Sequence, residues 1–220
     1  MADLPILLTF VAALFVLEIT PGPDMMLVLA RGIGQGRRVA LLTVVGMIFV
    51  AGVVQVGLLV LGVASLLKAY PAGLMLLQWV GAAYMLYLGA RMVWSSFGDA
   101  AESKRLAATE VSDWRAVREG TINSLTNPKS LLFMFAFLPQ FVDPTAGPVW
   151  LQLAVLGTVQ KLAGILSLGS VALASGTVGQ ALYRFPRLLV WQQRFTGAVM
   201  LGLGFRLLFA DNASAPAVKT

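Results

Sequence analysis

The chain has 220 residues, of which 58% are hydrophobic and only 12% are charged, and its mean hydropathy is +0.83. This composition excludes an ordinary water-soluble domain, because too few polar side chains are available to cover its surface. Cysteine and histidine are both absent, which excludes thiol redox chemistry, metal sites built from those residues and a histidine base. The net charge of +6 does not indicate a nucleic-acid partner, because the Lys and Arg side chains are spread over segments that flank apolar runs.

The apolar runs predict an all-α integral membrane protein with six transmembrane helices. A spanning helix needs about 20 residues, so the length is sufficient for six crossings with short connections. The fifth run is long for one upright crossing, and we expect it to tilt or to break near Gly164 or Gly169. The predicted spans are 4–30, 39–66, 72–95, 119–141, 149–175 and 188–210.

The first span is interrupted by Pro21-Gly22-Pro23. Three residues that are poor in a helix interior predict a break that leaves backbone carbonyls unpaired; the alternative is a simple kink that aids packing. Glu18, Thr20 and Asp24 flank the break, and a charge at the centre of a membrane helix costs about 2.5–3.5 kcal/mol. We therefore predict a substrate or proton pathway here, although contact of Asp24 with lipid headgroups is also open.

The second span carries a series of small residues, Gly46, Gly52, Gly57 and Gly62. Such residues favour close packing between helices over a binding role, and they also make a homodimer a candidate assembly. Single polar residues in membrane helices often only hold helices together. The weaker candidates of this kind in the second and third spans are Gln55, Gln78, Tyr84 and Tyr87.

The one long polar connection, about 98–118, carries both signs of charge and is predicted to be a solvated cytoplasmic loop. Lys and Arg favour the cytoplasmic side of a membrane protein. Most of them fall in this loop or near the connections between spans one and two and between spans five and six, whereas the opposite side carries only Lys68, Arg206 and Lys219. Both termini are therefore predicted on the non-cytoplasmic side, with a frayed tail at 211–220.

The fourth span contains a second break, Asn127-Pro128-Lys129. Lys129 is a cation between long apolar segments, and its expected partner is Asp24 or Glu18. Such a pair is either purely structural or is opened by a zwitterionic substrate, whose carboxylate binds Lys129 and whose amine binds an acid. We favour the second interpretation. Asn123, just before the break, is a further candidate for the pathway.

Gln160 and Lys161 lie within the fifth span. Lys161 either faces the pathway or extends its long apolar stem so that the ammonium reaches the membrane interface. Both residues are retained as candidates for the substrate or proton pathway. Neither they nor any other residues form a pattern that predicts a metal site or a bound cofactor.

The two halves of the chain resemble each other. Gly22-Pro23-Asp24-Met25 matches Asn127-Pro128-Lys129-Ser130, and the same offset brings Gln55 onto Gln160. Each half holds three spans, so the second half must enter the membrane from the opposite face. This predicts two inverted repeats, about 1–97 and about 119–210, with the site where they meet.

The chain resembles the LysE/RhtB-type amino-acid exporters. The resemblance covers most of the chain and rests on the order and spacing of three motifs: Thr20-Pro21-Gly22-Pro23-Asp24, residues 81–89 with the sequence GAAYMLYLG, and Asn127-Pro128-Lys129-Ser130 followed by residues 138–142 with the sequence LPQFV. It implies a bacterial inner-membrane protein of six spans that exports amino acids or related metabolites in exchange for protons. Many relatives have Asn in place of Asp24, and Lys161 is not typical of the group, so the substrate does not follow from the resemblance.

These features together predict a secondary transporter, not an enzyme. We expect it to export amino acids or closely related small zwitterionic metabolites from the cytoplasm by alternating access between the two repeats. Glu18 is the best-placed candidate for coupling to protons, because a carboxyl group removed from water can bind and release a proton near neutral pH. The alternative is a passive channel for small solutes.

Overall fold

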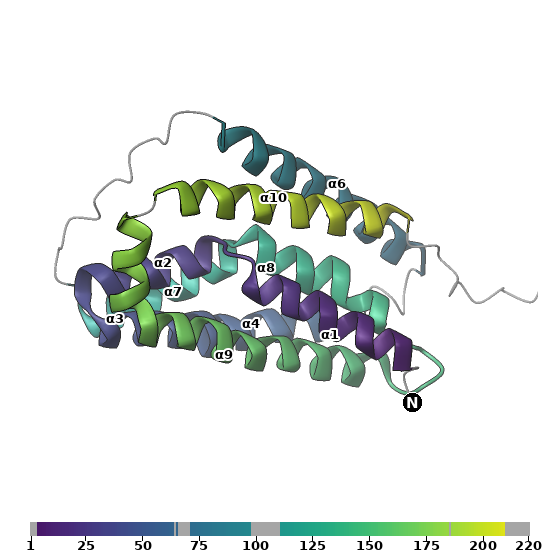
Figure 1. The fold of residues 1–220 in the computed structure, drawn as a ribbon. Helices are drawn as coiled ribbons and strands as arrows, with labels where there is room; N and C mark the ends of the chain where they lie inside the picture. Colours follow the sequence, from purple (N-terminus) through teal and green to yellow (C-terminus); the bar gives the residue numbers. More distant parts are fainter. Residues whose placement is uncertain (1–3, 64, 66–70, 98–110, 185, 210–220) are drawn as a thin grey trace, which may run out of the picture.

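The computed structural model describes residues 4–63, 65, 71–97, 111–184 and 186–209, and within these ranges the regular structure is helical (Figure 1). The predicted frayed tail, most of the polar connection and Lys68 lie outside the described residues. The all-helical prediction is confirmed for the part of the chain that is described.

The predicted break in the first span is present. Helix α1 (Leu4–Ile19) ends before the Pro-Gly-Pro motif and α2 (Pro23–Gln35) begins within it, with a bend of 41° between them. Pro23 suits the first position of a helix because its missing N–H would be unpaired there, and Gly22 before it is extended. A sharp turn at Gly36, whose φ is +90°, leads into the next helix.

The second span is one long helix of several geometries. Helix α3 (Arg37–Val45), the π-helical turn η1 (Gly46–Val50), α4 (Ala51–Leu58) and a second π-helical turn η2 (Leu59–Val63) follow one another without a gap. Helix α6 (Pro71–Ser95) comes next.

The fourth predicted span is broken, as expected, at Asn127. Helix α7 (Asp113–Thr126) ends there, and α8 (Pro128–Leu132), the π-helical turn η3 (Phe133–Phe137) and the 3₁₀ turn η4 (Leu138–Phe141) follow. The expected start at 119 is wrong, because the helix begins at Asp113, where the Ser112 hydroxyl accepts a hydrogen bond from the Arg115 N–H (3.4 Å).

The fifth predicted span is longer than expected and unbroken. Helix α9 (Val149–Arg184) continues through Gly164 and Gly169, so of the two expectations for this span the break is wrong, and the tilt stays a prediction. Isolated glycines weaken a helix by only about 1 kcal/mol each, and packing along α9 outweighs that cost. Helix α10 (Pro186–Phe209) follows.

Two helices of the described residues are long and apolar enough to cross a membrane, Arg37–Val63 and Val149–Gly176, and the bent pair of α1 and α2 makes a third if it counts as one span. The chain is therefore a helical membrane protein with several candidate crossings. The full set of six crossings stays a prediction.

Two apolar cores lie at different levels of the helix assembly. One contains residues of α1, η2, η3 and the start of α9, such as Phe10 and Phe133; the other contains residues of α2, α3, η1 and the later part of α9, such as Val28 and Leu168. In the first, second and fifth predicted spans, the stretch between the two cores carries buried polar side chains. Helices α6 and α10 pack on each other at one side of the molecule (Figure 1).

Ion pairs tie α7 to α2 and α3, near the connection between the first two predicted spans. Arg31 of α2 binds Glu119, which also accepts from Arg115 (2.8 Å), and Arg38 of α3 binds Asp113 (2.5 Å). Part of the segment that was predicted to be a solvated loop thus belongs to a packed helix.

The predicted close packing of the second span is present at Gly46, where α7 approaches. A Cβ on Gly46 would lie 2.0 Å from the Val117 carbonyl oxygen, whereas a Cβ on Gly57, in the same span, would meet nothing within 4 Å. The glycine series therefore contacts a neighbouring helix at Gly46, whereas no neighbouring atom lies close to Gly57.

We predict that Gly46→Val destabilises the protein by about 1–3 kcal/mol, because two backbones would have to separate. Gly57→Val, the matched control, should unfold at the same temperature as the wild type or slightly higher. Thermal unfolding of both variants in detergent tests this, and equal melting temperatures for the two would contradict the close contact.

Candidate functional site

The first break leaves backbone carbonyls without helical partners, and Lys129 binds two of them. Its Nζ donates to the carbonyl oxygens of Leu17 (2.9 Å) and Thr20 (2.6 Å). The carboxyl end of a helix carries a partial negative charge, so an ammonium group is well placed there. The Thr196 hydroxyl of α10 donates to the carbonyl of Pro21 (2.8 Å) and binds a third group of the same break.

The second break positions Lys129. Asn127 is extended and caps α8, with its Oδ1 accepting from the Lys129 backbone N–H (3.1 Å). The Lys129 stem then passes over Gly22, where an added Cβ would lie 3.2 Å from Cε. The two breaks are thereby joined through one side chain.

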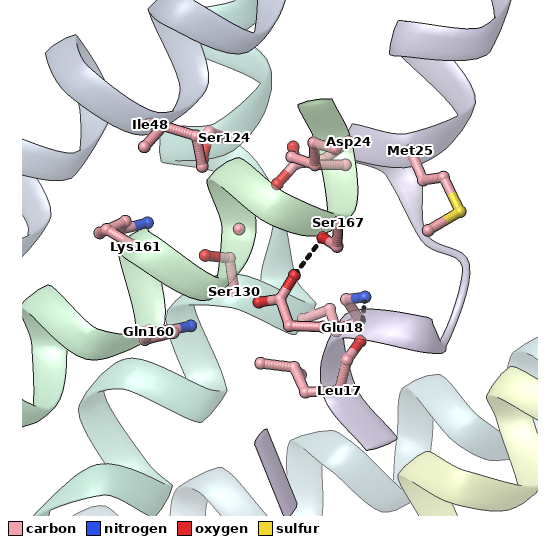
Figure 2. Close-up of a pocket in the computed structure, with 13 residues that line it drawn as sticks. Leu17, Glu18, Asp24, Met25, Ile48, Ser124, Ser130, Gln160, Lys161 and Ser167 are labelled. Carbon is pink, nitrogen blue, oxygen red and sulfur yellow. Dashed lines mark hydrogen bonds between the residues drawn. The ribbon is translucent and has the colours of Figure 1, made fainter. Parts of the chain in front are cut away.

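The expected ion pair between Lys129 and an acid is wrong. Among the described residues, the acids nearest the break make other bonds: the Asp24 carboxylate accepts from Asn123 Nδ2 (2.6 Å), and the Glu18 carboxylate accepts from the Ser167 hydroxyl (2.5 Å; Figure 2). The physical reason is that the interrupted helix supplies carbonyl oxygens that compete with the acids for the Lys129 ammonium. The position of these oxygens relative to Lys129 cannot be read from the sequence.

Lys161 faces inward, so the alternative of an ammonium extended to the membrane interface is wrong. Its side chain is 9% exposed, and its Nζ donates to Gln55 Oε1. Gln55 in turn donates through Nε2 to the Ser124 carbonyl (2.9 Å). Gln55, a weaker candidate in the sequence, therefore belongs to the site.

One small cavity brings all four ionisable candidates together. Its volume is about 40 Å³, room for a few water molecules. Gln160 also lines it, and the Gln160 Oε1 atom is buried without a hydrogen-bond partner. The lining residues labelled in Figure 2 include Glu18, Asp24, Ser124, Ser130, Gln160, Lys161 and Ser167, and Lys129 completes the charged set.

Other predicted residues lie around this cavity but not on its wall. Thr20, Asn123 and Asn127 hold the breaks and Asp24 through the bonds given above. Tyr84 and Tyr87 stack on each other with exposed rings and do not line the cavity. The side chain of Gln78 lies outside the described residues.

Sequence reasoning missed Ser124, Ser130 and Ser167, which line the cavity, and Thr196. Hydroxyl residues are common in membrane helices and often bond to their own helix, so nothing in the sequence distinguished these four. The offset between the repeats does place Ser130 opposite Met25, and both line the cavity, but that match carried no chemical signal.

The formal charges of the side chains that line the cavity balance, because two are acidic and two are basic. Neutral groups separate them: Ser167 binds one acid, Asn123 the other, and Gln55 and backbone carbonyls bind the two amines. Because charges interact strongly where water is scarce, a guest with one positive and one negative group fits this environment without adding net charge.

A helical membrane protein with a buried, charge-balanced cavity at two helix breaks is the class that the fold and the site define. The sequence model of the family described as LysE type translocator matches residues 15–211. The chain belongs to the LysE type translocator family, and the resemblance seen in the sequence is confirmed.

Similar proteins extend over nearly the whole chain. An uncharacterized membrane protein of Pseudomonas aeruginosa is 32% identical over 92% of this chain and 94% of its own length. A leucine efflux protein of Salmonella typhimurium is 31% identical over 90% of this chain and 91% of its own. An uncharacterized membrane protein of Vibrio cholerae is 29% identical over 94% and 98%. No solved structure matches.

We predict that Asn127→Ala lowers the free energy of unfolding by about 1 kcal/mol, the usual cost of losing a helix cap. Asn127→Ser, which keeps a capping oxygen, should retain most of the stability. The measurement is thermal unfolding in detergent. If Ala and Ser variants are equally destabilised, the cap does not account for the position of Lys129.

Proposed function

We propose that the protein exports amino acids or closely related small zwitterionic metabolites from the cytoplasm by alternating access, in exchange for protons. The observation that carries this proposal is the convergence of two acids and two amines on one buried cavity beside two helix breaks. Membership of a translocator family and the leucine efflux protein among the relatives support export of amino acids.

The cavity offers complementary groups for both ends of an amino acid. The Lys129 ammonium has three N–H donors and uses two of them on carbonyls, so the third is available for a substrate carboxylate. The substrate amine would bind Glu18 or Asp24 together with the unpartnered Gln160 Oε1. These protein groups replace part of the hydration that each end of the substrate loses when it leaves water.

The small volume of the cavity supports a cycle of opening and closing. At about 40 Å³ the cavity does not hold a whole amino acid, so binding requires the helices to move apart on one side. We propose that the breaks at Gly22 and Asn127 are the hinges, that six spans form two inverted repeats, and that both termini lie outside the cytoplasm. This construction places the site of a secondary transporter between its repeats.

The experiment that tests export is an amino-acid panel with the purified protein in liposomes. Labelled substrate should move against its gradient when a pH gradient is imposed, and unlabelled substrate on the opposite side should drive exchange. A passive channel would show only downhill flux and no exchange, and that result would contradict the proposed mechanism.

We predict that Lys129→Ala reduces export about 10- to 100-fold, because a hydrogen bond to a charged group contributes about 1.5–3 kcal/mol. Arg206→Ala, which removes an exposed cation of α10, is the control and should export normally. Both variants should elute as folded protein in detergent, with a lower melting temperature for Lys129→Ala because the carbonyls of Leu17 and Thr20 lose their donor. Normal export by a folded Lys129→Ala variant would remove Lys129 from the site.

We predict that Glu18→Gln retains substrate exchange but loses the response to an imposed pH gradient. The amide keeps the size of the carboxyl group and can still bond Ser167, but it cannot carry a proton. Asp24→Asn is the comparison, since it alters the other acid of the cavity. If the Glu18 variant still concentrates substrate in response to the pH gradient, another group carries the proton.

A further inference from the structure

A second cavity lies on the other side of the helix breaks and is much larger than the first. Its volume is about 220 Å³, against about 40 Å³ for the charged cavity. Its walls come from four places: the start of α2 at Gly22, the start of α8 at Pro128, Leu88 and neighbouring residues of α6, and Met200 with Thr196 on α10. It therefore lies between the two breaks and the pair formed by α6 and α10.

Lys129 is the residue that the two cavities share. Its stem passes over Gly22, and its ammonium lies at the end of α1. A molecule whose carboxylate binds this ammonium can therefore extend its other end along the stem into the larger cavity.

The lining of the second cavity is suited to an apolar group. Most of its wall is carbon, from proline, leucine and methionine side chains, while Arg91 supplies a charge at an exposed position. The Thr196 hydroxyl donates its hydrogen to the Pro21 carbonyl and so does not offer that donor to the cavity. Binding pockets for small molecules combine such apolar walls with a few polar groups that fix orientation.

We propose that this cavity is the side-chain subsite of the transporter and that it takes the aliphatic side chain of the exported amino acid. The inference rests on the proposed function. The charged cavity would bind the amine, Lys129 the carboxylate, and the larger cavity a branched or straight hydrocarbon of about four carbons. A hydrocarbon side chain is better placed in the larger cavity, because the charged cavity is lined by ionisable and polar groups.

Specificity for aliphatic substrates then depends on the wall that α10 supplies, where Met200 is 4% exposed. A bulkier residue there shortens the subsite, and a smaller one lengthens it. Each methylene gained or lost in an apolar pocket changes discrimination by about 10- to 200-fold, so changes at Met200 should alter which amino acids are exported more than how fast they are.

The test measures export of alanine, valine, leucine and phenylalanine by Met200→Trp and Met200→Ala in liposomes. We expect Met200→Trp to lower the ratio of leucine to alanine export at least about tenfold, and Met200→Ala to raise the ratio of phenylalanine to leucine by a similar factor. Ala198→Phe adds a ring to an exposed position of the same helix and should leave every ratio as in the wild type.

The possible results of this test distinguish failure of the side-chain subsite from failure of the proposed function. Export of amino acids by the wild type with unchanged ratios in a folded Met200 variant would overturn the subsite and leave the proposed function standing. A wild type that exports none of the four amino acids would overturn both. If Met200→Trp does not fold, the ratio for Met200→Ala decides alone. If export by a Met200 variant changes only with the chain length of the lipids in the liposomes, the cavity binds an acyl chain and the proposal is overturned.

Discussion

The structure depends on one cation that is held by the broken end of a helix. The Lys129 ammonium binds the carbonyls of Leu17 and Thr20, which have no helical N–H to pair with once Pro21-Gly22-Pro23 ends α1. Unpaired carbonyls in a membrane cost several kcal/mol each, and so does an unpaired ammonium. Each feature makes the other tolerable, and the pairing connects two segments that are more than a hundred positions apart along the chain.

Two apolar cores and a polar layer between them follow from this arrangement. The residues of each core are closely packed, as at Phe133 and Val28, and between the cores three predicted spans carry the polar side chains Glu18, Gln55 and Lys161. Neutral side chains separate the charges, and a zwitterion can exchange places with them at little electrostatic cost. The charged cavity, which we propose binds the polar ends of the substrate, and the apolar cavity, which we propose binds its side chain, meet at Lys129.

Sequence reasoning predicted both helix breaks and the residues at them, because proline and buried charge act locally and leave clear signals. It did not predict the partner of Lys129, since the sequence indicates unpaired carbonyls at the first break but not that this ammonium reaches them in place of the acids. The inward direction of Lys161 depends on Gln55, which lies three predicted spans earlier in the chain, so only packing could decide it. The unbroken α9 and the early start of α7 at Asp113 are similar cases, in which neighbouring helices outweighed glycine or polar composition.

The central claim is that substrate binds between the two breaks, and the absence of cysteine allows a direct measurement of it. A Ser130→Cys variant carries a thiol in the charged cavity, and Ala146→Cys carries one in an exposed turn between η4 and α9. The rate of reaction with a small thiol reagent should fall several-fold at position 130 when leucine is present and stay constant at position 146. Equal rates at position 130 with and without leucine, under conditions in which leucine is exported, would place the site elsewhere.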